Sequence, residues 1–202
     1  MNDMEACTRG LLVVVSGPSG VGKGTVCKCL CEMDAEVVLS ISATTRKPRP
    51  QEHDGQQYYF LSLEDFLAKI AAGEFLEWAE VYGNYYGTLR EQVQTQRTAG
   101  YDVILEIDTQ GAMQIRSACP DAIFVFLLPP SFGELQQRIN GRATESAEII
   151  RLRLSKAEYE MSLADEYDYR IVNQTVEQTA SELLAVLQEE KHHHNRERES
   201  LC

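Results

Sequence analysis

The residues best suited to chemistry form a glycine-rich segment near the start of the chain, Gly17-Pro18-Ser19-Gly20-Val21-Gly22-Lys23-Gly24-Thr25. The segment matches the G-x-x-x-x-G-K pattern of a phosphate-binding loop, and it follows the apolar run 11–15, which predicts the preceding strand. Glycines permit the positive φ angles that let successive N–H groups converge on an anion, and the positive end of the following helix adds to the attraction. Lys23 would supply a point charge for the outer phosphates.

One position of this loop departs from the usual pattern. The residue after the lysine is commonly Ser or Thr, whose hydroxyl ligates Mg²⁺, but here it is Gly24. Thr25 comes one residue later, where a helical turn aims its side chain elsewhere. We therefore expect the loop to bind phosphates well and Mg²⁺ to be held mainly through water and nucleotide phosphates. The departure favours a small-substrate kinase over a switch GTPase.

Length and charge restrict the classes of partner. At 202 residues the chain can bury one substantial core, and we expect a single domain over 1–202. A net charge of −12 argues against nucleic acid as a partner, because phosphate backbones require a basic surface. No apolar stretch has the length of a membrane span and the first residues lack the basic start of a signal peptide, so we expect no membrane partner and a cytoplasmic location. Anionic ligands must meet local clusters, which are Arg46-Lys47-x-Arg49 and the set Arg138, Arg142, Arg151 and Arg153.

Neither the cysteines nor the histidines have the spacing of a metal site. Cys27, Cys29 and Cys31 alternate along an expected helix, where residues two apart point to opposite sides, and no C-x₂-C pair occurs. They are typical of small buried residues or free thiols in a cytosolic protein. The histidines 192–194 lie in the charged segment 191–202, which we expect to be a flexible, solvated tail.

Apolar runs alternate with amphipathic segments along most of the chain. The patterns predict strands at 11–16, 36–42, 102–107, 122–128 and 169–173, and helices at 23–33, 109–117 and 176–190. Continuous apolar strands separated by helices predict an α/β fold, a parallel sheet covered by helices on both faces. We assign residues 9–41, 99–130 and 155–190 to this core.

Two polar segments interrupt the alternation. Residues 42–98 are rich in tyrosine, and their pattern predicts short strands near 58–61 and 75–82 with a helix at 63–72, as a small antiparallel or mixed insert. Residues 131–154 predict a helix–turn–helix in which Arg138 and Arg142 lie one turn apart, Gly141 breaks the first helix and Thr144 caps the second. Polar insertions on a phosphate-binding core are where a second substrate site and a lid would be built.

The motifs in these segments resemble those of one enzyme family. The chain contains S-x-T-T-R-x-P-R from Ser42, G-x-x-Y-x-F from Gly55, F-L-E-W-A from Phe75, G-N-Y-Y-G-T from Gly83, D-x-Q-G from Asp108 and R-x-x-x-R from Arg138. Together with the phosphate-binding loop, they make residues 11 to about 173 similar to guanylate kinases. The resemblance implies a nucleoside monophosphate kinase that uses ATP with Mg²⁺ and phosphorylates GMP, with dGMP left open.

The resemblance also assigns roles to individual residues. It implies that the GMP phosphate is held by Arg46, Arg49, Tyr58 and Tyr86, and that guanine is read by Ser42, Glu77, Thr88 and Asp108. It implies that ATP phosphates are covered by Arg138, Arg142 and Arg153, with Asn173 near adenine. The chemistry agrees, since guanine presents N1–H and N2–H₂ donors to a carboxylate, whereas adenine presents an acceptor there. Tyrosine hydroxyls beside arginines suit a phosphate.

Taken one at a time, several of these residues leave other interpretations open. Glu77 could be a surface carboxylate, Tyr86 a core aromatic and Asn173 a turn residue at the end of a strand. The residues do not decide whether Glu106 or Asp108 serves the metal. Two functional alternatives also stay open: a non-catalytic guanylate-kinase-like module that binds phosphopeptides, and a kinase of another nucleoside monophosphate. The presence of Lys23 and the lid arginines favours catalysis.

Overall fold

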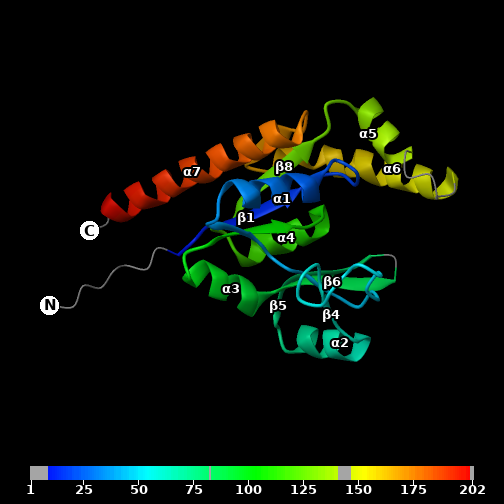
Figure 1. Cartoon of the computed structure of the whole chain (residues 1–202), viewed down its shortest axis with the longest axis horizontal. Coiled ribbons are helices and arrows are strands. Elements are labelled where there is room, and N and C mark those ends of the chain that lie inside the picture. Colours follow the sequence, from blue (N-terminus) through cyan, green and yellow to red (C-terminus); the bar gives the residue numbers. More distant parts are fainter. Residues whose placement is uncertain (1–8, 82, 141–146, 201–202) are drawn as a thin grey trace. The chain divides into compact units, whose positions relative to one another are not determined.

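The computed structural model describes residues 9–81, 83–140 and 147–200 (Figure 1). The chain divides into two compact units. The first unit comprises Met1–Val14 and Val38–Ala122, and the second comprises Val15–Val37 and Ile123–Cys202. The phosphate-binding loop belongs to the second unit and the tyrosine-rich insert to the first.

The predicted parallel sheet is confirmed, with five strands in the order β2-β7-β1-β8-β9. The strands are β1 (Leu12–Ser16), β2 (Val37–Leu39), β7 (Asp102–Glu106), β8 (Ile123–Leu128) and β9 (Tyr169–Val172). Every residue of β1 is buried, as a strand covered on both faces requires. The strand expected over 36–42 ends at Leu39, and residues 43–44 belong to a different sheet.

In the second unit, α1 (Lys23–Met33) lies against α7 (Val176–Ser200) and buries Val26, Cys27 and Leu30 (Figure 1). Cys27, Cys29, Cys31 and Cys119 are free thiols. The helix α7 continues ten residues beyond the end expected at residue 190, so residues 191–200 of the expected tail are helical. Residues 176–200 contain neither glycine nor proline, and Lys191 forms an ion pair with Glu36 at 3.2 Å, so neither sequence nor contacts end the helix at 190.

The lid segment also lies in the second unit. The segment expected to form the lid, residues 131–154, contains α5 (Phe132–Asn140) and the start of α6 (Ala147–Ser162), which runs eight residues beyond the expected boundary. A single turn of 3₁₀ helix follows at Ala164–Glu166. Leu135 and Ile139 of α5 pack on Ala157 of α6, so the two expected helices are present and in contact. The expected break at Gly141 and cap at Thr144 lie outside the described residues.

The insert of the first unit is a four-stranded sheet in the order β4-β3-β6-β5. Its strands are β3 (Ala43–Thr44), β4 (Tyr59–Phe60), β5 (Phe75–Val81) and β6 (Asn84–Leu89). β3 pairs with β4 in parallel and the other pairs are antiparallel, so the sheet is mixed. The parallel pair arises because the chain leaves β3 through a long loop, residues 45–58, and returns in the same direction.

Three helices complete the first unit: α2 (Leu63–Ala71), α3 (Arg90–Thr98) and α4 (Thr109–Ala118). Ser62 caps α2 by accepting a hydrogen bond from Asp65 N, and Phe66 of that helix stacks on Phe75 with ring centroids 4.4 Å apart. The helix α3 was not among the expected elements, since only Val93 and Arg97 are buried in it and its sequence has no apolar periodicity.

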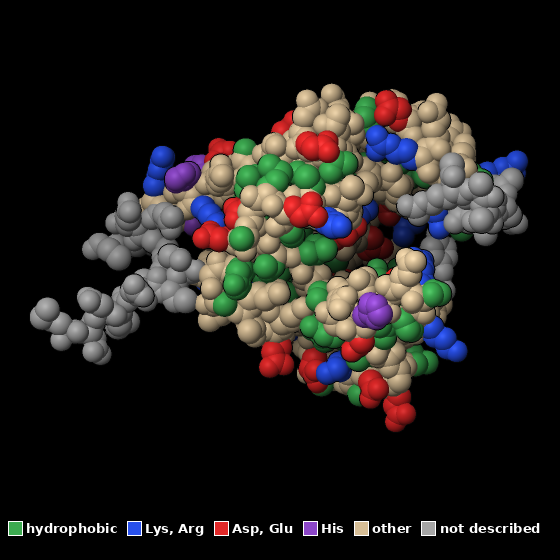
Figure 2. Space-filling view, viewed as in Figure 1, with side chains coloured by type: hydrophobic (Ala, Val, Ile, Leu, Met, Phe, Trp, Pro, Cys, Tyr) green, Lys and Arg blue, Asp and Glu red, His purple; other side chains and the backbone are tan. Residues whose placement is uncertain are grey.

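Two surface properties of the folded chain bear on its partners: the distribution of charged side chains and the apolarity of its helices. Acidic and basic side chains are intermingled on the face drawn in Figure 2. Within the described residues 9–81, 83–140 and 147–200, no helix combines the length and apolarity needed to cross a membrane.

Candidate active site

The phosphate-binding loop of the second unit has the backbone that its glycines predict. Gly17, Gly20 and Gly22 have φ angles of 150°, 86° and 101°. A Cβ atom on Gly17 would lie 2.5 Å from the carbonyl oxygen of Leu127, and one on Gly22 would lie 2.7 Å from Asn173 Nδ2. A side chain at either position would therefore face both an unfavourable φ and a steric clash.

Lys23 begins α1, and its ammonium group lies over the loop. Its Nζ donates hydrogen bonds to the carbonyl oxygens of Gly17 at 2.6 Å and Pro18 at 3.4 Å. Gly24 and Thr25, in the same helical turn, are exposed. The positive charge and the N-terminus of α1 are thus both at the loop, as phosphate binding requires.

Asn173 supports the loop through the carbonyl oxygen of Val21. It follows β9 and is only 4% exposed, and its Nδ2 donates to Val21 O at 2.7 Å while its Oδ1 accepts from Thr179 Oγ1 at 3.0 Å. Arg138 NH1, from α5, donates to the same carbonyl at 3.3 Å. Two predicted ATP-side residues therefore converge on one loop carbonyl, a link that sequence patterns do not reveal.

Two further arginines of the lid segment, Arg151 and Arg153, lie in α6. Arg153, which the resemblance places over the ATP phosphates, is partly buried, whereas Arg151, which it does not, is exposed. Arg138 also lies 3.7 Å from Glu134, one turn earlier in α5. Arg142 lies outside the described residues.

In the first unit, the predicted guanine reader Glu77 is a buried carboxylate, so the surface interpretation is wrong. Glu77 is 5% exposed and Thr88 is 1% exposed. The two are register partners in β5 and β6, and Thr88 Oγ1 donates to Glu77 Oε1 at 2.6 Å. The pairing of the strands therefore fixes the orientation of the carboxylate.

The first turn of α4 approaches the other oxygen of Glu77. A Cβ atom on Gly111 would lie 2.6 Å from Glu77 Oε2, so only glycine leaves room for the carboxylate. Asp108 caps this helix, and its Oδ1 accepts from the N–H groups of Gln110 and Gly111, both at 3.1 Å. Burial, assisted by the negative charge of Asp108, raises the pKa of Glu77 to about 7, although the Thr88 hydrogen bond acts in the opposite direction.

The residues expected to hold the GMP phosphate gather elsewhere in the insert. The Arg46 guanidinium lies 5.3 Å from the centre of the Tyr58 ring, and the Tyr58 and Tyr86 rings meet edge-on at 6.0 Å. Tyr86 forms a side-chain hydrogen bond with Arg46 and is only partly buried, which disfavours a purely structural role. Arg49 is exposed, and Ser42 accepts through its backbone carbonyl a hydrogen bond from Tyr59 N at 2.9 Å.

Sequence reasoning missed one residue of this cluster, Glu52. Its carboxylate accepts hydrogen bonds from Arg46 NH1 and NH2, both at 2.9 Å, and from Arg49 N at 2.8 Å. The available signal was its position three residues after Arg49 in a basic, proline-rich turn. An acidic residue there predicts a local ion pair.

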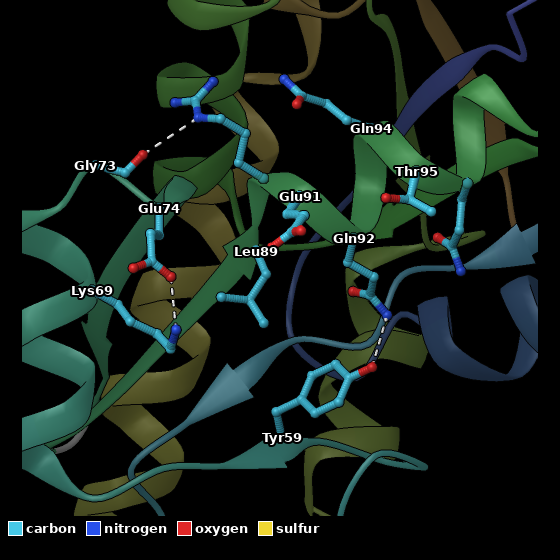
Figure 3. A pocket seen from close by; sticks show the side chains of 11 residues that line it. Tyr59, Lys69, Gly73, Glu74, Leu89, Glu91, Gln92, Gln94 and Thr95 are labelled. Carbon is cyan, nitrogen blue, oxygen red and sulfur yellow. Dashed lines mark hydrogen bonds and ion pairs between the residues drawn. The ribbon is translucent and has the colours of Figure 1, made fainter.

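The first unit also contains a cavity of about 520 Å³, which is lined in part by Tyr59, Lys69 and Gln92 (Figure 3). Several of its polar lining groups pair with one another. Lys69 Nζ lies 2.7 Å from Glu74, Gln92 Nε2 donates to Tyr59 Oη at 3.4 Å and Arg90 Nε donates to Gly73 O at 3.4 Å. None of the residues predicted to bind GMP lines this cavity.

Together, the two units contain three kinds of binding group. The second unit offers backbone N–H groups and cations for a polyphosphate. The first unit offers a buried carboxylate for a pair of N–H donors, and an arginine–tyrosine cluster for a single anionic group. Within residues 9–81, 83–140 and 147–200, His, Cys, Asp and Glu side chains do not assemble into a group of three that could bind a metal ion.

Comparisons of the sequence and of the structure with known proteins all match the same family, over almost the entire chain. A model of the family described as Guanylate kinase matches residues 9–190. The guanylate kinase of Clostridium perfringens (strain 13 / Type A) is 46% identical over 201 residues, covering 100% of this chain and 93% of that protein. That of Symbiobacterium thermophilum is 51% identical over 183 residues, covering 91% and 87%. Among solved structures, the crystal structure of guanylate kinase from Anaplasma phagocytophilum is 36% identical with a TM-score of 0.74, covering 91% of this chain and 87% of that chain.

Proposed function

The chain belongs to the guanylate kinase family, and we propose that it transfers the terminal phosphoryl group of ATP to GMP, giving ADP and GDP. The single observation that carries the choice of GMP is the Glu77 carboxylate, which is 5% exposed and held by Thr88. Burying a carboxylate without sufficient partners is costly, so the site favours a ligand that brings donors. Guanine brings N1–H and N2–H₂, whereas adenine would bring an acceptor.

The phosphate of GMP is bound by the arginine–tyrosine cluster. Arg46 and Arg49 carry the positive charge, and the hydroxyl groups of Tyr58 and Tyr86 supply neutral donors. Ser42 and Asp108 complete the guanine site. Because base and phosphate are recognised by separate groups, the insert would hold GMP at both ends and orient its phosphate as the attacking group.

Phosphoryl transfer needs positioning and charge neutralisation more than a strong base. The loop N–H groups and Lys23 would bind the outer phosphates of ATP. Arg138, Arg142 and Arg153 would neutralise charge that develops on the transferred group, and Asn173 would help to shape the loop for adenosine phosphates. Exclusion of water by the lid would prevent hydrolysis of ATP.

Mg²⁺ would enter with ATP and supply further charge neutralisation on its phosphates. The residue after Lys23 is Gly24, which has no side-chain oxygen, so the loop fits an ion that keeps most of its ligands as water and phosphate oxygens. Glu106 is partly buried at the end of β7, and Asp108 follows two residues later; these two carboxylates are the candidates for an outer ligand of the ion.

The deciding experiment is turnover with a panel of acceptors. Coupled ADP release is measured with GMP, dGMP, AMP and UMP at constant ATP and Mg²⁺. We expect GMP to have the highest kcat/KM among the ribonucleotides, as an enzyme of purine nucleotide metabolism in the cytoplasm would require. Faster turnover with AMP or UMP would assign the other monophosphate kinase activity. No turnover with any acceptor, together with phosphopeptide binding, would favour the non-catalytic module.

A further inference from the structure

Glu52 contacts the phosphate-binding cluster without being one of the groups assigned to GMP. Its carboxylate forms two parallel hydrogen bonds with Arg46, both 2.9 Å long, in the fork geometry that fixes a guanidinium in a plane. The side chains of Arg46 and Glu52 are 18% and 14% exposed. The pair is therefore partly buried, whereas the majority of surface ion pairs are exposed.

Glu52 is itself held by the backbone of its own turn. Its N–H donates to the carbonyl oxygen of Arg49 at 3.0 Å, and its Oε2 accepts from Arg49 N at 2.8 Å. These reciprocal bonds tie both the main chain and the carboxylate of Glu52 to residue 49. The carboxylate is thus a fixed part of the turn, not a side chain that swings freely.

The fixed carboxylate determines where the Arg46 guanidinium lies. Arg46 is held from one side by Glu52 and by the carbonyl oxygen of Lys47, to which NH1 donates at 2.8 Å. Its other neighbours include Tyr86, with which it forms a side-chain hydrogen bond, and the rings of Tyr58 and Phe60, whose centres are 5.3 and 5.9 Å from the guanidinium carbon. A long arginine side chain otherwise samples many rotamers, and ordering it on ligand binding would weaken affinity.

We propose that Glu52 is a positioning residue for the GMP phosphate: it holds Arg46 in the orientation that binds the phosphate before GMP arrives. The proposal rests on the proposed function, because it assumes that the arginine–tyrosine cluster receives the phosphate of GMP. Glu52 itself does not contact the ligand in this role. Because Arg46 is already ordered by Glu52, the binding of GMP does not have to include the entropic cost of ordering this side chain.

The same geometry also permits the opposite effect of Glu52 on GMP binding, and the two roles predict different changes in affinity when Glu52 is replaced. A carboxylate bound by an arginine fork and a backbone N–H resembles a bound anion, so Glu52 could occupy the place of the phosphate and compete with it. Removing a competitor would strengthen GMP binding, whereas removing a positioning residue weakens it. The sign of the change therefore distinguishes the two.

The experiment measures binding of GMP and of guanosine by calorimetry to the full chain and to Glu52→Gln. The glutamine keeps the shape and one acceptor for Arg49 N–H but loses the charge and directs N–H groups at the guanidinium. We expect the dissociation constant for GMP to rise by at least about tenfold, while guanosine, which lacks the phosphate, changes by less than about twofold. Glu80→Gln, at an exposed position of β5, is the matched control and should change neither.

A second comparison tests whether Glu52 acts through Arg46. In an Arg46→Ala background, Glu52→Gln should have no further effect on GMP affinity, because there is no guanidinium left to orient. The ATP KM and the melting temperature of Glu52→Gln should stay close to wild type.

Three results would overturn the inference. Tighter GMP binding by Glu52→Gln would assign the competitor role, and an equal loss for GMP and guanosine would assign a role in folding the turn. An undiminished effect of Glu52→Gln in the Arg46→Ala background would exclude action through Arg46. Failure of the wild-type chain to bind GMP would instead overturn the proposed function itself.

Discussion

Glu77 is a deeply buried carboxylate whose position is fixed by its neighbours in the first unit. Thr88 donates to Oε1 at 2.6 Å, and Gly111 leaves space beside Oε2. A carboxylate in this setting discriminates by chemistry, not by size, because a ligand with an acceptor in that position leaves a charge unpaired.

Glu77→Gln should therefore reduce the GMP kcat/KM by at least about one to two decades, on the basis that a mispaired contact to a charged group costs about 1.5–3 kcal/mol. AMP turnover should rise relative to GMP, without becoming efficient. Steady-state kinetics with both acceptors measure the ratio. If selectivity were unchanged, the guanine reader would lie elsewhere, with Ser42 and Asp108 as the next candidates; Glu80→Gln again serves as control.

The raised pKa of Glu77 predicts a pH dependence of base binding. With a pKa of about 7, caused mainly by burial and also by the charge of Asp108, the carboxyl is mostly neutral below that pH, whereas guanine requires its ionised form. Guanosine affinity should thus rise about tenfold between about pH 6 and about pH 8, with a proton released on binding. Guanosine is used because the phosphate of GMP titrates near pH 6. Glu77→Gln should flatten the profile, and a steep profile in that variant would assign the dependence to another group.

At the scale of elements, the approach of α4 to β5 depends on one glycine. Gly111→Ala places a Cβ where Oε2 of Glu77 lies 2.6 Å away, so the carboxylate or the helix must shift. We expect GMP kcat/KM to fall by at least about tenfold, while stability changes little, because Ala favours the helix by about 0.5–1 kcal/mol. Gly133→Ala in α5 is the matched control, since its nearest contact would be 3.8 Å away. Equal activity of the two variants would show that Gly111 is not needed for space.

The phosphate-binding loop depends on β9 and α7 through Asn173. Asn173→Asp replaces the donor to Val21 O by an oxygen, so two acceptors would face each other in a site only 4% exposed. We expect a loss of about 1–3 kcal/mol in unfolding free energy and a higher KM for ATP, with guanosine binding unchanged. Denaturant titration and kinetics measure the two effects. Gln174→Glu makes the same change at an exposed neighbour; if it had equal consequences, added charge alone would be the cause.

At the scale of the whole molecule, the candidate binding groups are divided between the two compact units. The loop, Lys23 and Asn173 belong to the second, whereas Arg46 and Glu77 belong to the first. Under the proposed function, residues of the second unit bind ATP and residues of the first unit bind GMP, and phosphoryl transfer then needs the two nucleotides in line. Because the net charge is −12, we expect anionic ligands to bind at these local clusters.

This division predicts separate protection by the two substrates in hydrogen exchange. GMP alone should slow exchange of amides in β5 and β6, and a non-hydrolysable ATP analogue with Mg²⁺ should slow exchange in residues 17–25. Bound ligands stabilise the segments they contact against local opening. The apoprotein and a sample with adenosine serve as references. Protection of residues 17–25 by GMP and not by the ATP analogue would contradict the assignment of substrates to units.

The sequence alone determined the phosphate-binding loop, several buried strands and the family of this protein. The loop glycines and the apolar runs of β1, β7 and β8 are recognisable without the fold, because positive φ and continuous burial each require particular residue types in sequence. The motifs also indicated the family, and through it they predicted that Arg46, Arg49, Tyr58 and Tyr86 bind a phosphate. Helix α1 has the bounds that its pattern predicts.

Only the tertiary structure decided how those residues are supported. The burial of Glu77, the room that Gly111 leaves for it, and the convergence of Asn173 and Arg138 on Val21 O all join segments distant in sequence. The extension of α7 to Ser200 was likewise missed, because a charged segment without apolar periodicity carries no signal for helix until its contacts are known. Sequence patterns report what each segment prefers alone, whereas burial and steric contact depend on which other segments pack against it.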